Sequence, residues 1–212
     1  EDTTAGIIVG RDVSELQHLI GQLTRLSIMD DLTEIYNVRY FWARFRYELV
    51  RSRRYGHPLS VVMLDLDRFK RLNERYGHQV GDDVLAYVAQ VMKANTREAD
   101  VLARYGGEEF AVVLPNTECE GARIYAENMR RQIEGCVIHH GAGDISVTVS
   151  AGVAALSPDI HSEDELLRRA DVALHHAKHS GRNRVSVWSP KQDKELKGAP
   201  ECRPPMPRAG VI

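Results

Sequence analysis

The sequence predicts an α+β fold in which a mixed, largely antiparallel sheet is flanked by helices. Two observations predict it. Apolar runs of strand-like composition alternate along the chain with segments whose apolar residues recur every three or four positions, which indicates interleaved strands and helices. The segment 101–114 contains two apolar runs joined by Gly106-Gly107, a pattern typical of a long β-hairpin and therefore of antiparallel pairing.

The first 28 residues are expected to precede this domain. The phrase from Gly6 to Leu16, Gly-Ile-Ile-Val-Gly-Arg-Asp-Val-Ser-Glu-Leu, resembles the last strand and exit helix of a PAS sensor domain, so residues 1–12 are interpreted as the end of an upstream sensor. Apolar residues at three- and four-residue steps predict a connector helix over 13–28 that is able to pair as a short coiled coil.

The elements up to residue 94 follow from local signals. An amphipathic pattern rich in arginine and aromatic residues predicts a helix over 38–56, which Gly56-His57-Pro58 ends. The apolar, β-branched run after it predicts a strand over 58–65. Helices are expected over 68–75 and 79–94, with Gly77 between them.

The elements beyond the hairpin complete a domain that spans residues 29–189. Helical spacing predicts helices over 118–134 and 163–179, and strands are expected over 145–153 and 184–188. The tail, residues 190–212, contains five of the eight prolines and little apolar periodicity, so it is predicted to be disordered.

Composition fits a cytoplasmic globular domain. The 212 residues, 43% of them hydrophobic and 27% charged, suffice for one domain with a substantial core. A net charge of −2 gives no indication of a nucleic-acid or membrane partner. The three scattered cysteines lack metal-ligand spacing and are expected to be reduced thiols. No apolar stretch approaches the roughly 18 residues of a membrane span.

Two acidic clusters suggest a site for a cation and a phosphate. Glu108 and Glu109 directly follow the Gly-Gly turn and are expected to point to opposite sides of the next strand. Asp65 and Asp67 end the strand predicted over 58–65 and are expected to share a face. Because a basic run starts at Arg68, the pattern indicates Mg²⁺ together with a polyphosphate.

These residues belong to a longer series of motifs that resembles the GGDEF family of diguanylate cyclases. The resemblance covers roughly residues 28 to 188, in that family's order and spacing. The motifs are Asp30-x-Leu32-Thr33, Tyr36-Asn37, Asp65-Leu66-Asp67-x-Phe69-Lys70-x-x-Asn73, Tyr76-Gly77-His78-x-x-Gly81-Asp82, Arg104-Tyr105-Gly106-Gly107-Glu108-Glu109-Phe110, Ser150-x-Gly152-Val153 and Ala170-Asp171-x-Ala173-Leu174-x-x-Ala177-Lys178-x-x-Gly181-Arg182-Asn183. Two positions depart from the pattern: Glu34 stands where Gly is usual and His175 where Tyr is frequent.

The resemblance implies a fold like the palm of nucleotidyl cyclases and polymerases, and an enzyme that joins two GTP molecules into cyclic di-GMP with release of two pyrophosphates. It implies Mg²⁺, with Mn²⁺ as a substitute, bound by the carboxylates of Asp65 and Glu108 and the Leu66 carbonyl, while Glu109 bridges a second ion. Glu108 is also a candidate base for the 3′-hydroxyl, although a metal-bound carboxylate is a poor base and metal polarisation of the hydroxyl competes with that role.

The remaining substrate contacts are likewise implied by position. Phe69 would offer its backbone N–H to the phosphates, Lys70 would stabilise the transition state, and Lys178 and Arg182, interpreted as one helical turn apart, would face the terminal phosphates. Base choice falls to three residues, Asn73, His78 and Asp82. Taken alone, Asn73 and Asp82 are also typical of helix starts and turns.

A separate pair, Arg97 and Asp100, has the spacing of the family's inhibitory site for cyclic di-GMP, although an ordinary surface ion pair would have the same pattern. One nucleotide site per domain implies a homodimer with facing sites. Two alternatives stay open: a catalytically silent receptor for cyclic di-GMP or GTP, and a cyclase with relaxed base choice that makes mixed dinucleotides.

Overall fold

The computed structural model describes residues 28–141 and 143–196. The predicted PAS-like segment 1–12 and residues 197–212 lie outside this part of the chain, and so does the predicted connector helix 13–28 apart from Ile28. Among the described helices, none has the length and apolar character needed to cross a bilayer.

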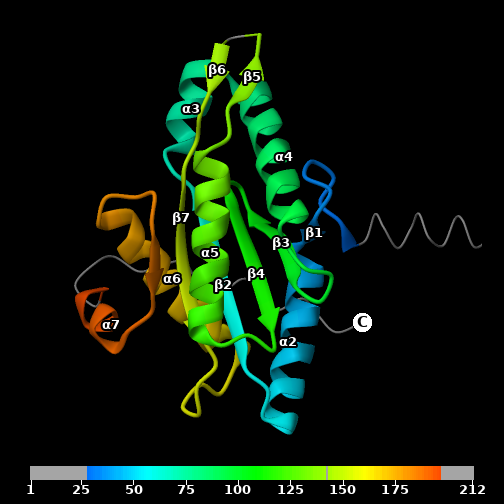
Figure 1. Cartoon of the computed structure of the whole chain (residues 1–212), viewed down its shortest axis with the longest axis vertical. Coiled ribbons are helices and arrows are strands. Elements are labelled where there is room, and N and C mark those ends of the chain that lie inside the picture. Colours follow the sequence, from blue (N-terminus) through cyan, green and yellow to red (C-terminus); the bar gives the residue numbers. More distant parts are fainter. Residues whose placement is uncertain (1–27, 142, 197–212) are drawn as a thin grey trace, which may run out of the picture.

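A six-stranded sheet forms the centre of the fold, in the order β1-β3-β4-β2-β7-β8 (Figure 1). The pairings β3–β4, β4–β2 and β2–β7 are antiparallel, whereas β1 and β8 add to the two edges in parallel. The predicted mixed, largely antiparallel sheet is therefore confirmed. The strands of the sheet are β1 (Tyr36–Asn37), β2 (Leu59–Leu66), β3 (Val101–Gly106), β4 (Glu109–Pro115), β7 (Val149–Ala155) and β8 (Val185–Val187).

Helices cover both faces of this sheet, so two apolar cores form. One core packs β2 side chains such as Leu64 against α4 and α5, and the other packs side chains such as Met63 against α2 and α6. Because alternate residues of β2 enter opposite cores, the whole strand is buried and all of it except Ser60 and Asp65 is apolar. The helices are α2 (Val38–Tyr55), α3 (Phe69–Tyr76), α4 (His78–Ala94), α5 (Cys119–Glu134), α6 (Glu163–His179) and α7 (Pro190–Leu196).

The predicted strand over 145–153 is wrong in its first half. The chain instead forms a small two-stranded hairpin, β5 (Ile138–His140) with β6 (Gly143–Ile145), and β7 begins only at Val149. Residues 146–148 lie between β6 and β7. The Thr148 carbonyl oxygen accepts from the Asp67 backbone N–H at 2.8 Å, so this segment is bonded to the residues after β2 before the β2–β7 pairing begins. Alternation of apolar residues does not distinguish such an interval from a strand.

The tail prediction needs a second correction, because residues 190–196 form helix α7. Pro190 is its first residue, a position where proline's fixed φ suits a helix and its missing N–H costs nothing. Asp193 pairs with Arg168 of α6 at 2.8 Å, and Gln192 Nε2 donates to Ser186 Oγ at 3.0 Å. These contacts fasten the end of the described chain to α6 and β8.

Candidate active site

The site lies where β2 ends beside the turn between β3 and β4. The Leu66 backbone N–H donates to the Glu108 carbonyl oxygen at 3.2 Å, which holds the strand end against the hairpin tip. A bulge between Arg104 and Gly106 interrupts the β3–β4 pairing. Gly107 has a φ of +34°, which residues with a Cβ rarely adopt, so the predicted role of glycine in this turn is confirmed.

Arg104 braces the hairpin tip, a role for which sequence reasoning gave no signal. Its guanidinium donates to the Gly107 carbonyl oxygen at 3.0 and 3.1 Å and pairs with the Asp30 carboxylate at 3.2 Å. Burial raises the pKa of Asp30, but hydrogen bonds from Thr33 and the charge of Arg104 outweigh it and leave that pKa below its usual value. The residues of the Asp30-x-Leu32-Thr33 motif therefore support the turn that carries the acids.

Three carboxylates gather around this turn. Asp65 and Glu109 stand opposite each other in the β2–β4 register, so their side chains share one face of the sheet, and both are buried. Glu108, which directly precedes β4, lines a cleft next to this turn. Burial raises the pKa of Asp65 to about 6; Lys178 Nζ, 2.6 Å away, opposes this shift, and the charges of Glu108 and Glu109 add to it.

This donor set fits a hard divalent cation, because oxygen ligands are what such ions prefer and a cation would relieve the repulsion among the acids. Across residues 28–141 and 143–196, no three His, Cys, Asp or Glu side chains are arranged to hold a metal by themselves. A cation bound by Asp65 and Glu108 would therefore need further ligands, such as the Leu66 carbonyl and the phosphates of a substrate.

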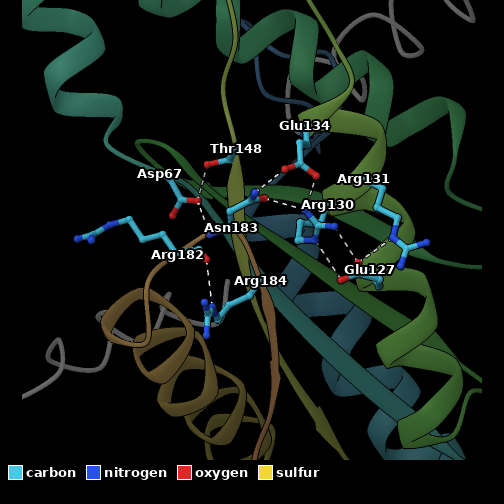
Figure 2. Close-up of polar contacts among 9 residues, drawn as sticks. All are labelled: Asp67, Glu127, Arg130, Arg131, Glu134, Thr148, Arg182, Asn183 and Arg184. Atoms are coloured by element: carbon cyan, nitrogen blue, oxygen red, sulfur yellow. Dashed lines mark hydrogen bonds and ion pairs between the residues drawn. The ribbon is translucent and has the colours of Figure 1, made fainter.

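Asp67 has a different environment from Asp65. Its Oδ1 accepts from Ser150 Oγ at 2.7 Å. Its Oδ2 accepts from Thr148 Oγ1 at 2.7 Å and from the Asn183 backbone N–H at 2.9 Å (Figure 2). A carboxylate with three short donors is already neutralised in part. The structure thus assigns Asp67 to cross-linking the chain rather than to the cation suggested by its spacing from Asp65.

Helix α3 begins directly after this strand end and presents its first turn to the site. Arg68, with a φ of +59°, precedes the helix and makes no side-chain cap. The N–H groups of Phe69 and Lys70 lie in the first turn, where a helix has no internal acceptors. The Lys70 side chain is 89% exposed and 4.0 Å from Glu74, so it is available to an anion.

A cleft of about 590 Å³ brings six of the predicted site residues together. Its wall also includes Leu85, which no sequence motif indicated, and Arg104 and Gly107, which were expected only as parts of a motif. The predicted residues that line it are Phe69, Lys70, Asn73, His78, Asp82 and Glu108.

Asn73, which lines this cleft, packs closely against Gly81. Asn73 Oδ1 is buried and accepts no hydrogen bond from any described residue. A Cβ added at Gly81 would lie 1.9 Å from Asn73 Oδ1 and 3.2 Å from Phe69 Cζ. Gly81 therefore leaves the space that the Asn73 amide occupies, and the amide oxygen is an unused acceptor for a donor on a ligand.

On the substrate contacts that the family resemblance implies, replacing Gly81 by alanine is expected to raise the KM for GTP roughly tenfold, because it would displace the Asn73 acceptor and cost one hydrogen bond to the base. Steady-state kinetics of Gly81→Ala would show the change in KM with a smaller change in kcat. Gly121→Ala is the control, since its added Cβ would meet only the Thr117 methyl group, at 3.1 Å. An unchanged KM in the Gly81→Ala protein would contradict this account of the cleft.

The two basic residues from the end of α6 are not arranged as predicted. Lys178 is in the last turn of the helix and pairs with Asp65. Arg182 lies beyond the helix, because Gly181 has a φ of +119° and the Arg182 N–H donates back to the Ala177 carbonyl oxygen at 3.1 Å. The four-residue spacing is therefore not one helical turn, and Arg182 belongs to the loop that leads into β8.

Arg97 and Asp100 line a second cavity of about 650 Å³, where α4 leads into β3. Asp100 Oδ2 accepts from the Arg97 backbone N–H at 3.2 Å, and burial raises the pKa of Asp100 while that N–H opposes the shift. Among the described residues, no ion pair within 4.0 Å joins these two side chains, although the charge of Arg97 also lowers the pKa of Asp100.

Comparison with known proteins decides the family. Residues 27–184 match the family described as "Diguanylate cyclase, GGDEF domain". The chain belongs to the GGDEF family. The resemblance inferred from the motifs is thereby confirmed, and the helix-flanked sheet is the fold of its structural neighbours.

Relatives of this GGDEF domain include diguanylate cyclase A of Treponema denticola, which is 40% identical over 169 residues. The match covers 78% of the present chain and 46% of that protein, so the chain spans less than half of this relative's length. The remaining length of the relative has no counterpart in the alignment.

Two solved structures share the fold. The coiled coil and GGDEF domain of DgcB from Caulobacter crescentus, in complex with c-di-GMP, has a TM-score of 0.79 and 30% identity, covering 84% of this chain and 95% of that one. The active GGEEF domain of a diguanylate cyclase from Vibrio cholerae has a TM-score of 0.69 and 35% identity, covering 72% and 97%.

Proposed function

We propose that this GGDEF domain condenses two GTP molecules into cyclic di-GMP with release of two pyrophosphates. The observation that carries the proposal is the cleft in which the unused Asn73 acceptor and Asp82 lie with Glu108, an acid of the β3–β4 turn. One cleft thus combines groups suited to a nucleobase with groups suited to a triphosphate. The relatives named as diguanylate cyclases support the same reaction class.

Base selection would come from acceptors in the cleft. Guanine presents N1–H and N2–H side by side, and the Asp82 carboxylate is able to accept from both, while Asn73 Oδ1 accepts at the same edge. His78, on the same wall, is available to the base as a further polar contact. Adenine has no such pair of donors, so it would leave buried acceptors unpaired, which is the costly outcome.

The phosphates would be held by groups from two elements. The Phe69 N–H lies at the start of α3, where an anion is stabilised by the unpaired N–H groups and the helix dipole. Lys70 from the same turn would face the charge that develops at the reacting phosphoryl group. Lys178, which pairs with Asp65, and Arg182 of the loop after α6 would face the terminal phosphates.

Asp65 and Glu108, with the Leu66 carbonyl, would hold Mg²⁺ or Mn²⁺, and Glu109 would contribute to a second ion. A bound cation would neutralise charge on the triphosphate and the attacking 3′-oxygen. We assign Glu108 to cation binding, because a carboxylate next to a cation has its proton affinity lowered and takes up a proton poorly.

Pyrophosphate release tests the proposal directly. With Mg²⁺, the protein is expected to release pyrophosphate from GTP much faster than from ATP, and chelation of the divalent cation should abolish the release. Equal rates with the two nucleotides would contradict the assigned roles of Asn73 and Asp82. GTP binding without any pyrophosphate release would favour the catalytically silent receptor.

The reaction also requires two domains. Each domain offers one cleft and hence one GTP, whereas the product needs two nucleotides that attack each other, so we infer a two-fold dimer with facing sites. An upstream sensor joined by residues 13–28 would set the spacing of the two domains. Activity per molecule is therefore expected to fall on dilution; a constant value down to concentrations at which sedimentation shows only monomer would contradict the dimer.

Product feedback would act through Arg97 and Asp100. The Arg97 guanidinium suits a phosphate or a guanine face, and the cavity that it lines is large enough for a nucleotide ligand. Arg97→Ala is expected to relieve inhibition by added cyclic di-GMP at least severalfold, with little change in the initial rate, because the cavity is separate from the cleft. The initial-rate assay is repeated over a series of product concentrations, and unchanged inhibition in Arg97→Ala would contradict the assignment.

A further inference from the structure

The loop between α6 and β8 holds three successive residues at positive φ. The values are +119° for Gly181, +64° for Arg182 and +47° for Asn183. Side chains with a Cβ disfavour this region, and two such residues in a row persist only where their surroundings hold them. The hydrogen bonds that stabilise this backbone conformation therefore also determine how the loop orients its side chains.

The backbone of the loop is fixed from the β2 side. The Asn183 N–H donates to Asp67 Oδ2 at 2.9 Å, and the Thr148 hydroxyl group donates to the same oxygen (Figure 2). The Ser150 hydroxyl group donates to Asp67 Oδ1. Asn183 and Asp67 are 116 positions apart in the chain. This bond consequently ties the loop to the segment that directly follows Asp65 and Leu66.

The side chain of Asn183 is fixed from the opposite side by helix α5. Its Oδ1 accepts from the Arg130 guanidinium at 2.8 Å, and its Nδ2 donates to Glu134 Oε1 at 2.6 Å. Arg130 also pairs with Glu134 at 2.6 Å and with Glu127 at 2.8 Å, so its position on the helix is itself constrained. Both ends of the Asn183 amide are thus used.

Arg182 is the residue that this arrangement orients. Its side chain is exposed and extends away from α5, on the side of Asp67 (Figure 2). In the described part of the chain, no acidic side chain lies within ion-pair distance of its guanidinium. A charged group held on a constrained backbone, with no acidic partner there, is available to an anion.

We propose that Asn183 is a positioning residue for Arg182. Together with Asp67 and the Arg130–Glu134 pair, it holds the loop in the conformation that directs Arg182 to the terminal phosphates of GTP. This inference rests on the proposed function, because it takes the ligand to be a triphosphate. None of Asn183, Arg130 and Glu134 lines the cleft, so their effect on the ligand would be indirect.

The test compares two ligands that differ only where Arg182 would act. One is a GTP analogue with a methylene bridge between the α and β phosphorus atoms, which cannot release pyrophosphate; the other is GMP, which lacks the terminal phosphates. Binding of both is measured by calorimetry in Mg²⁺. Asn183→Gly keeps the backbone freedom of the loop and removes both side-chain bonds, so it is expected to bind the analogue roughly tenfold more weakly and GMP unchanged.

A second pair of variants separates positioning from helix stability. Arg130 and Arg131 both pair with Glu127, but only Arg130 contacts Asn183. Arg130→Ala should weaken binding of the analogue, and Arg131→Ala should not. In an Arg182→Ala background, Asn183→Gly should cause no further loss, because the group that it positions is already absent.

The outcomes are distinguishable. Equal weakening of GMP and the analogue in Asn183→Gly, or a full further loss in the Arg182→Ala background, would mean that Asn183 acts on the fold as a whole and would overturn the inference. Unchanged binding of the analogue by Asn183→Gly would overturn it as well, while leaving the proposed function intact. Failure of the unaltered protein to bind the analogue at all would overturn both.

Discussion

Replacing Glu108 by alanine is expected to lower turnover of GTP by roughly 100-fold or more, which is the scale of loss when a group at the reacting centre is removed. Glu108 is one of only two carboxylates assigned to the cation, and it lines the cleft in which the base groups lie. The fold should be retained, because a partly exposed side chain at a hairpin tip buries little surface. The measurement is the initial rate of cyclic di-GMP formation at saturating GTP and Mg²⁺.

Glu118→Ala is the matched control for this variant. Glu118 is also a glutamate, lies shortly after β4, is exposed, and makes no capping hydrogen bond to α5. Its replacement removes the same charge and should leave the rate within about a factor of two. A Glu108→Ala protein that is folded and turns over at the normal rate would contradict the cation site proposed for Asp65 and Glu108.

Replacing Gly152 by alanine is expected to destabilise the domain by about 3 kcal/mol or more, the upper range for overpacking of a rigid core. A Cβ at Gly152 would lie 2.1 Å from the Ala170 carbonyl oxygen and 2.2 Å from the Leu174 backbone N. These are backbone atoms of α6, so no side-chain rotation relieves the clash and the helix must move away from β7. Movement of α6 would also disturb Lys178 near the helix end.

Thermal unfolding followed by circular dichroism checks this prediction. A loss of about 3 kcal/mol corresponds to a fall in Tm of roughly 10 °C for a domain of this size. Gly121→Ala is again the control, because its Cβ meets only the Thr117 methyl group and alanine favours the helix. A Tm for Gly152→Ala equal to that of the unaltered protein would contradict the predicted clash, because it would mean that the space between β7 and α6 accommodates a methyl group.

Much of the fold was predictable because local patterns and tertiary structure agree. The apolar run ending at Asp65 is a strand buried on both faces, and Gly106-Gly107 joins two strands as its turn chemistry predicts. The site residues of the cleft were predictable for a different reason. Phe69, Lys70, Asn73 and Asp82 fall within nearby family motifs, so their positions follow from the chain order once the family is identified.

The roles of Asp67 and Arg182 depend on contacts between segments that are far apart in the sequence, and a local sequence pattern does not predict such contacts. The spacing of Asp65 and Asp67 predicts similar roles, but hydroxyl groups more than 80 positions away bind Asp67. The spacing of Lys178 and Arg182 predicts one helix face, but the chain leaves the helix before Arg182. The positive φ values that make this possible are stabilised by Asp67 and α5, not by the loop's own sequence.

The most direct test of the central claim is to incubate the protein with equal concentrations of GTP and ATP in Mg²⁺ and to identify the products by mass spectrometry. The account predicts cyclic di-GMP as the dominant dinucleotide, accompanied by two pyrophosphates for each product molecule. Mixed or adenine-only cyclic dinucleotides in comparable amounts would contradict the role assigned to Asn73 and Asp82. The absence of any cyclic dinucleotide at concentrations where the protein is dimeric would contradict the proposed activity itself.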